Sequence, residues 1–255
     1  MNLPLRYRPV PDSPPARWDA RWKLAAVLAA AFGIAAINHL APAAVAFAAG
    51  LLLLAAARLP VRWVQARLAV FALAALPFLV VLPFTLDTAG PGWDLGPVRA
   101  SERGLVAGLA VFFRCLAIGT FALVLVGTAP LHHTLTAAHK LKVPGLLVLL
   151  ALLAYRYAFL LADELRRLRV ALWVRGFRTR ANRHGYRTLG HVVGAVLVRG
   201  ADRAGHVADA MRCRGFDGRF HTLTAFRTTP ADVGAFALLV SATIALVLWD
   251  RLGLS

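Results

Sequence analysis

The sequence predicts an all-α polytopic membrane protein with five or six spanning helices and a cytoplasmic insertion of two amphipathic helices. Hydrophobic residues make up 59% of the 255 residues and charged residues only 16%, whereas soluble domains are about a quarter charged. Several apolar runs are long enough to cross a bilayer, which takes about 20 helical residues. The net charge of +17 is concentrated in one stretch, which holds fourteen arginines and six acidic residues between Asp163 and Asp232.

The N-terminal segment is basic and precedes the first apolar run. No small-residue cleavage site follows that run, so we expect it to remain as a spanning helix. The basic residues of the segment are Arg6, Arg8, Arg17, Arg21 and Lys23.

Six apolar runs are the candidates for spanning helices. About 17 residues is the shortest workable span, so the second run is marginal. The runs lie at about 24–40, 43–57, 66–84, 104–127, 144–162 and 233–249.

The distribution of basic residues predicts the topology. Cytoplasmic loops carry an excess of Lys and Arg, so Arg58, Arg62 and Arg67 place the second loop on the same side as the N-terminus. If 144–162 also crossed the membrane, the arginine-rich stretch would lie outside, against this rule. We therefore expect five spans, with residues 130–162 forming helices along or under the cytoplasmic leaflet, the N-terminus inside and the C-terminus outside.

This topology divides the chain into four parts. A basic cytoplasmic N-terminus is followed by a transmembrane region, a cytoplasmic or interfacial coupling domain and a final transmembrane helix. Their predicted ranges are 1–23, 24–127, 128–232 and 233–255.

The arginine-rich stretch has the periodicity of two amphipathic helices. Leucines recur at steps of 4, 3 and 4 from Leu161 to Leu172, and a second apolar stripe runs from Leu189 to Met211. Each helix ends on the same x-Arg-Gly-Phe pattern, at 174–177 and at 213–216, 39 residues apart.

The twin pattern has two readings. Glycine just past a helix end supplies a left-handed cap, and arginine in the last turn suits the negative end of the helix dipole. A single Arg-Gly stop is explained by capping alone. Its recurrence with phenylalanine on two consecutive helices favours a docking device with two prongs.

Motifs for catalysis or metal binding are not found in the sequence. There is no Gly-rich loop ending in Lys-Ser/Thr, so we expect no ATP hydrolysis by this chain, and it has neither His-Glu-x-x-His nor Gly-x-Ser-x-Gly. His132 and His133 are adjacent and point in different directions on a helix, and the two cysteines lack the spacing of a zinc site. We predict a non-enzymatic protein that binds no metal or cofactor of its own.

Arg114 is the clearest ionisable residue within a predicted span. An arginine in the bilayer is costly, so it should have a partner, reach water or extend to an interface. The scarcity of other intramembrane charges argues against a proton pump or an intrinsic ion pathway.

Four further motifs accompany the two x-Arg-Gly helix ends. They are Asp19-x-Arg21-x-Lys23, Gly127-Thr128-Ala129-Pro130, Leu141-Lys142-Val143-Pro144, and Tyr155-Arg156-Tyr157 with Asp163-Glu164. Together these features resemble the T component of energy-coupling factor (ECF) transporters, in particular the cobalt/nickel group (CbiQ-like), over nearly the whole chain. Val174 and Cys213 stand where the family's paired Ala-Arg-Gly signatures have alanine; both are small enough for close helix packing.

The resemblance implies a scaffold in the bacterial inner membrane that joins a membrane substrate-capture subunit to a pair of cytoplasmic ATPases, which hydrolyse the ATP. It assigns Arg175 and Arg214 as prongs that meet acidic groups on the ATPases, and Gly176 and Gly215 as the points of close approach. The helices around 130–172 would meet the capture subunit. The substrate would be cobalt, with nickel or a vitamin as alternatives.

Two other classes of function are compatible with part of the pattern. A membrane-anchored basic protein could bind anionic lipid or nucleic acid through the arginines, but Trp173, Phe177, Phe216 and Phe220 cluster at helix ends instead of forming a stacking stripe. We therefore expect no nucleic-acid partner. A lipid-modifying enzyme would need clustered Asp, Glu or His, and the twelve acidic residues are scattered.

Overall fold

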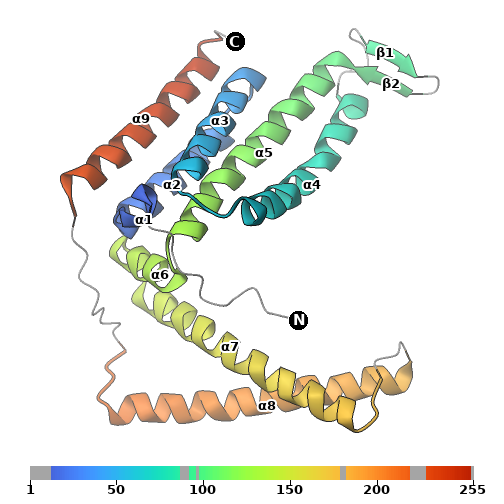
Figure 1. The fold of residues 1–255 in the computed structure, drawn as a ribbon, viewed down its shortest axis with the longest axis vertical. Helices are drawn as coiled ribbons and strands as arrows, with labels where there is room; N and C mark the ends of the chain where they lie inside the picture. Colours follow the sequence, from blue (N-terminus) through green and yellow to red (C-terminus); the bar gives the residue numbers. More distant parts are fainter. Residues whose placement is uncertain (1–12, 87–91, 96–97, 179–181, 219–227, 254–255) are drawn as a thin grey trace. The chain divides into compact units, whose positions relative to one another are not determined.

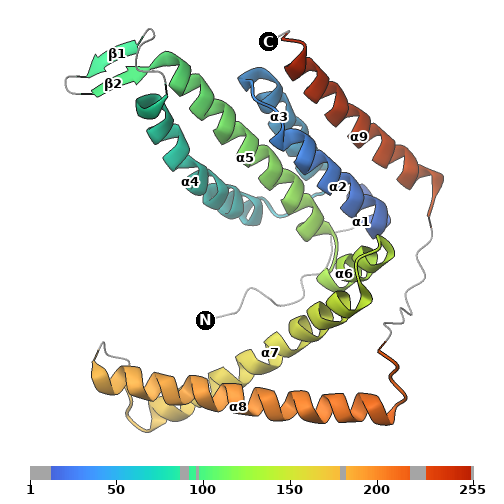
Figure 2. The same cartoon turned by 180° about the vertical axis from the view of Figure 1, so that it is seen from behind.

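The computed structural model describes residues 13–86, 92–95, 98–178, 182–218 and 228–253. The chain divides into two compact units. One unit is formed by helices α7 and α8, and the other contains the remaining described elements. Figures 1 and 2 show the elements of each unit.

The described elements are helical apart from one short hairpin. Strand β1 pairs antiparallel with β2, with Gly92 opposite Ser101 and Leu95 opposite Val98. The element order is α1 (Pro14–Arg17), α2 (Ala20–Ala35), α3 (Leu40–Ala56), α4 (Val61–Thr85), β1 (Gly92–Leu95), β2 (Val98–Ser101), α5 (Glu102–Thr128), α6 (Leu131–Lys140), α7 (Gly145–Val174), α8 (Arg183–Cys213) and α9 (Pro230–Arg251).

Helix α5 is the centre of the larger unit and packs against α2, α3 and α4 (Figure 1). Glycines bring the backbones together. A methyl group at Gly104 would lie 2.7 Å from Leu82 O on α4, and one at Gly50 would lie 2.0 Å from Thr120 Oγ1. Gly104 and Gly108 form a Gly-x-x-x-Gly pair facing α4. Small residues are the usual means of packing helices in a bilayer, where lipid removes most of the hydrophobic driving force.

Helix α9 packs along α2 although some 210 residues separate them (Figure 2). Gly33 faces Thr243, whose Cγ2 would lie 2.3 Å from an added methyl group. Trp22 and Phe236 make an edge-to-face ring contact at 5.2 Å. The last described helix, α9, is thereby part of the same helix bundle as α2.

The smaller unit is a pair of long helices. α7 has 30 residues and α8 has 31. Leu161, Leu165, Leu168 and Leu172, the stripe predicted from the sequence, are all half-buried, while their polar neighbours Arg166, Arg167 and Arg169 are exposed.

The all-α polytopic class is confirmed, with the 92–101 hairpin as an addition between the predicted runs at 66–84 and 104–127. Within the described ranges, four helices are long and apolar enough to cross a membrane, namely α4, α5, α7 and α9, and α3 is a shorter apolar helix. Helix α7 covers the 144–162 run that we expected along the leaflet, so the number of spans stays a prediction. The four-part division also stays a prediction; the contacts place α6, which packs on α2, with the larger unit.

Candidate functional site

The two x-Arg-Gly-Phe segments form the same backbone structure at the ends of α7 and α8. In the first, Gly176 N–H donates to Trp173 O and Phe177 N–H to Leu172 O, both at 3.0 Å. In the second, Gly215 N–H donates to Arg212 O at 3.0 Å and Phe216 N–H to Met211 O at 3.1 Å. This pair of bonds is the Schellman motif, which ends a helix with a left-handed residue.

Both glycines have φ of +77°, a value that disfavours any side chain. Space is not the constraint, because nothing described lies within 4 Å of a Cβ added at either position. The glycines are therefore required by the cap, and the surface around each is open to a partner.

Arg175 and Arg214 occupy the helix C-cap in the two motifs and are both exposed. Neither guanidinium makes a hydrogen bond or ion pair with the residues that the structure describes. The preceding residues, Val174 and Cys213, are also exposed. Each cap thus presents an arginine next to a small side chain.

The two helices meet near their midpoints. Leu161 Cδ2 lies 3.7 Å from a methyl group placed at Gly200. Arg175 follows Leu161 by 14 residues and Arg214 follows Gly200 by 14 residues. At 1.5 Å per residue, each arginine lies roughly 21 Å along its helix from this contact.

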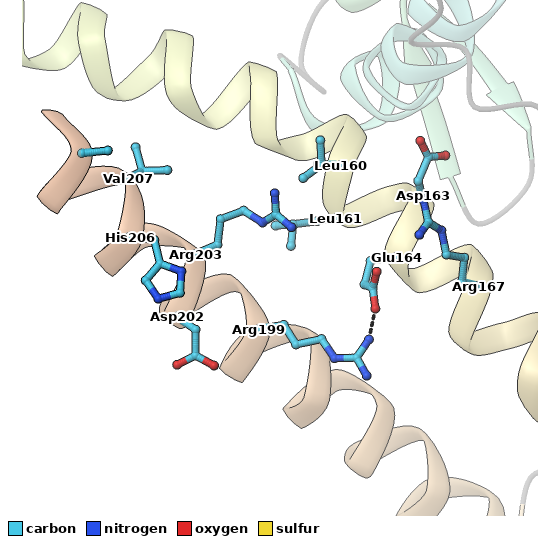
Figure 3. Close-up of a pocket in the computed structure, with 11 residues that line it drawn as sticks. Leu160, Leu161, Asp163, Glu164, Arg167, Arg199, Asp202, Arg203, His206 and Val207 are labelled. Atoms are coloured by element: carbon cyan, nitrogen blue, oxygen red, sulfur yellow. Dashed lines mark hydrogen bonds and ion pairs between the residues drawn. The ribbon is translucent and has the colours of Figure 1, made fainter.

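A charged cluster lies beside the crossing (Figure 3). Glu164 on α7 accepts a hydrogen bond from Arg199 on α8, and the two form an ion pair. Arg203 also extends from α8 toward α7, whereas the carboxylate of Asp202 points away (Figure 3). The cavity between the helices measures about 730 Å³ and is lined by Leu160, Leu161, Asp163, Glu164, Arg167, Arg199, Asp202, Arg203, His206, Val207 and Ala210.

In the larger unit, the Asp19-x-Arg21-x-Lys23 segment is a structural junction. Asp19 caps α2 by accepting Arg21 N–H at 3.0 Å, and it pairs with the Arg21 guanidinium at 2.8 Å. Arg21 reaches Thr228 Oγ1 at 2.9 Å. Lys23 is 1% exposed, and its Nζ donates to Thr128 Oγ1 at 3.1 Å. Two of the motifs identified from the sequence, around Lys23 and around Thr128, therefore meet.

Two aspartates, one near each end of α9, bind backbone N–H groups next to α2 and α3, and the sequence analysis did not assign either of them a role. Asp232 accepts hydrogen bonds from Thr229 N–H at 2.8 Å and Asp19 N–H at 3.2 Å, within a capping box at the start of α9. Asp250 accepts from Asn38 N–H at 3.0 Å and His39 N–H at 2.8 Å, at the start of α3. Thr229-x-x-Asp232 ahead of an apolar run is a capping-box signature, so the first of these was detectable.

Arg114 and Arg156 lie apart from both arrangements. Arg114 is half-buried on α5, and its Nε is buried without a hydrogen-bond partner among the described residues. The expectation that Arg114 has a partner, reaches water or extends to an interface stays a prediction. Arg156 is exposed on α7.

His132 and His133 stack with their ring centroids 4.4 Å apart on α6. Burial lowers the pKa of His133, and the neighbouring His132 lowers it further. In the part of the chain that the structure describes, no group of three or more His, Cys, Asp or Glu side chains could hold a metal ion.

Comparison with known proteins identifies the family. Residues 11–224 match the family model described as cobalt transport protein, CbiQ. The "Cobalt transport protein CbiQ" of Rhodobacter capsulatus is 31% identical over 132 residues, a stretch that covers 49% of this chain and 53% of that relative. The match thus spans about half the length of the curated relative. Since the family model covers most of the sequence, both helix-end motifs included, the chain belongs to the CbiQ cobalt transport protein family.

Proposed function

We propose that this chain is the transmembrane T subunit of an ECF-type ABC importer in the bacterial inner membrane, with its N-terminus in the cytoplasm. It links an ATPase dimer to a substrate-capture subunit for the uptake of cobalt, or of nickel. It binds no cofactor and catalyses no reaction itself. The observation that carries the proposal is the pair of identical exposed arginine caps on two crossing helices.

Arginine suits the role proposed for Arg175 and Arg214. Its guanidinium is a rigid fork that binds a carboxylate through two parallel hydrogen bonds. At a helix end free of other described contacts, it can be desolvated by a partner without breaking an internal pair. Acidic groups in a groove on each ATPase are the matching partner.

The crossing geometry supports coupling of the two caps to each other. Because each arginine lies about 21 Å from the Leu161–Gly200 contact, a small change in the crossing angle moves the two caps apart or together. Closure and separation of the ATPases would change that angle. The proposed result is a tilt of the capture subunit and release of its ion.

The capture subunit is proposed to bind α6 and the N-terminal half of α7. This part of α7 exposes a row of leucines, with Leu146 at 60%, Leu147 at 56% and Leu150 at 54%. Such a face requires either lipid or an apolar partner.

Copurification tests the docking assignment. The chain is coexpressed with the ATPases and capture subunit of its host and isolated in detergent as wild type and as the Arg175→Glu/Arg214→Glu double variant. Removing one member of a desolvated ion pair costs roughly 2–5 kcal/mol, and reversal adds repulsion. We expect the double variant to lose the ATPases, to retain the capture subunit and to abolish cobalt uptake.

The matched control is Arg166→Glu/Arg187→Glu, which makes the same change of net charge at exposed positions on α7 and α8 outside the 174–177 and 213–216 motifs. The control should retain the ATPases. Equal loss in both double variants would instead favour the alternative of a membrane-anchored basic protein that binds anionic partners through overall charge, because charge binding depends on number and not on position.

A further inference from the structure

A deep apolar groove runs along the larger unit between α9 and the helices α2, α3 and α5. It measures about 760 Å³. Its floor is buried and its rim is exposed. The floor residues include Val27, Ile34, Ala46, Phe121, Val124 and Leu239, and the exposed rim includes Ala56, Ala231, Ala235, Leu238 and Ala242.

Small side chains produce the groove. On α9, Ala231, Ala235 and Ala242 recur at helical spacing on the face that lines it, and α3 contributes Ala46, Ala49 and Ala56. Helix α9 is held along α2 by hydrogen bonds at both ends, through Asp232 and Asp250. These hydrogen bonds fix the position of α9, and the space between α9 and α3 therefore stays open.

The groove extends from one end of the bundle past its middle. Along α9 it runs from Asp232 to Leu246, which is 14 residues or roughly 21 Å. Half of the hydrocarbon core of a bilayer is about 15 Å thick. The groove is thus long enough to extend through the hydrocarbon part of one leaflet.

The end of the groove near the start of α2 has the character of a membrane interface. It is lined by Arg17, whose side chain is exposed, and by Trp18. Guanidinium has five N–H donors and can serve several acceptors at once, and tryptophan is enriched at the level of lipid headgroups. Asp232 lines the same end, but its carboxylate already accepts hydrogen bonds from Thr229 and Asp19. Among the residues that the structure describes at this end, Arg17, Asp19, Arg21, Lys23 and Asp232 together carry one positive charge.

We propose that this groove is a binding site for one anionic phospholipid. An acyl chain lies between α3 and α9, and the phosphate is bound at Arg17 beside Trp18. The lipid comes from the leaflet on the side of the N-terminus of α2. It fills the space between α9 and α3 and so completes the packing of the bundle.

The lining of the groove favours a lipid chain. The alanines on α3 and α9 leave an apolar channel that a thin, flexible acyl chain can follow, and Arg17 and Trp18 stand at one end of it.

Native mass spectrometry of the full chain, released from nanodiscs that hold equal amounts of phosphatidylglycerol and phosphatidylethanolamine, tests the site. We expect wild type to retain one phosphatidylglycerol. Ala235→Trp places an indole in the groove and should abolish retention. Its control, Ala237→Trp, alters an exposed alanine that does not line the groove and should retain the lipid.

Arg17→Gln tests the headgroup contact, with Arg62→Gln as the control at an exposed arginine outside the groove. Loss of one basic residue near the membrane should reduce phosphatidylglycerol retention about fivefold, while Arg62→Gln should not change it.

Brominated phosphatidylglycerol gives an independent readout, since it should quench Trp18 fluorescence in wild type, and the quenching should fall in Trp18→Phe. A wild type that retains no lipid, equal retention by both tryptophan variants, or equal effects of the two arginine variants would overturn the proposal.

Discussion

Lys23 shows how a single charged side chain can be accommodated in the larger unit. Lys23 is 1% exposed, and its ammonium group donates a hydrogen bond to Thr128, the last residue of α5. Thr128 in turn donates its hydroxyl hydrogen to Val124 O at 2.6 Å, so its oxygen is oriented to accept from Lys23. A buried charge requires such partners, because it has lost those that water supplies.

Thr128→Val should therefore destabilise the chain by about 1–3 kcal/mol, since it leaves a buried ammonium group without its acceptor. In Lys23→Met/Thr128→Val the donor is also removed, and the loss should be smaller than that of Thr128→Val alone. Equilibrium unfolding in mixed detergent micelles measures the four corners of this cycle. Strict additivity would show that the two side chains are not coupled.

Asp232 is the second residue whose removal should be costly. Asp232→Ala abolishes the capping box of α9 and the bond to Asp19 N–H, and we expect a loss of about 2–3 kcal/mol in unfolding free energy. Asp209→Ala is the control, because Asp209 forms only an exposed pair with Arg212 and surface pairs of this kind contribute little. If both substitutions had a similar, small effect in thermal unfolding, the hydrogen bonds of Asp232 would not hold α9 against α2.

At the scale of the helix, Gly176 and Gly190 should respond to alanine with opposite signs. Both have open space around an added Cβ, so the backbone conformation alone determines the sign of the stability change. Gly176 has φ of +77°, and Gly176→Ala should destabilise the end of α7 by about 1 kcal/mol. Gly190 lies inside α8, and Gly190→Ala should stabilise that helix by about 0.5–1 kcal/mol.

Hydrogen exchange followed by mass spectrometry resolves these local effects. Amides at 170–178 should exchange faster in Gly176→Ala, and amides at 186–198 more slowly in Gly190→Ala. Faster exchange in both variants would mean that Gly190 has a packing role that the structure does not contain.

The helices were largely predictable because apolar periodicity and length determine them. The run at 104–127 became α5 at Glu102–Thr128, and the run at 233–249 became α9 at Pro230–Arg251. The hairpin at 92–101 was not predicted, since its Gly, Pro and Asp content is equally typical of a loop. The position of α9 beside α2 depends on Gly33 meeting Thr243, a contact between distant residues that no local pattern encodes.

The candidate site was predicted to a similar extent. The caps at Gly176 and Gly215 follow from local chemistry, since an Arg-Gly helix end has few backbone solutions. The Glu164–Arg199 pair was not predicted, because it depends on where α7 and α8 cross. The role of Asp250 was also missed, since its partners are backbone N–H groups at the start of α3.

For the whole molecule, the charge distribution and the packing of the larger unit bear on topology together. α9 runs in the same direction as α2, because the start of α9 binds the start of α2 and the end of α9 binds the turn that follows α2. Their first residues are thus at one end of the bundle. If the N-terminus is cytoplasmic, α9 must begin on the cytoplasmic side, so the chain between α6 and α9 returns to that side.

Labelling of Cys213 tests this topology. Cys213 is an exposed free thiol at the end of α8, and Cys115 can be replaced by alanine to leave it as the single cysteine. Moving an arginine-rich stretch with fourteen arginines across the membrane contravenes the positive-inside rule. A membrane-impermeant maleimide should therefore label Cys115→Ala in inverted vesicles and in permeabilised cells, but not in intact cells.

The cysteine-free Cys115→Ala/Cys213→Ser variant gives the background. Labelling in intact cells would place the caps outside, where no cytoplasmic ATPase can reach them, and would refute both the topology and the docking proposal.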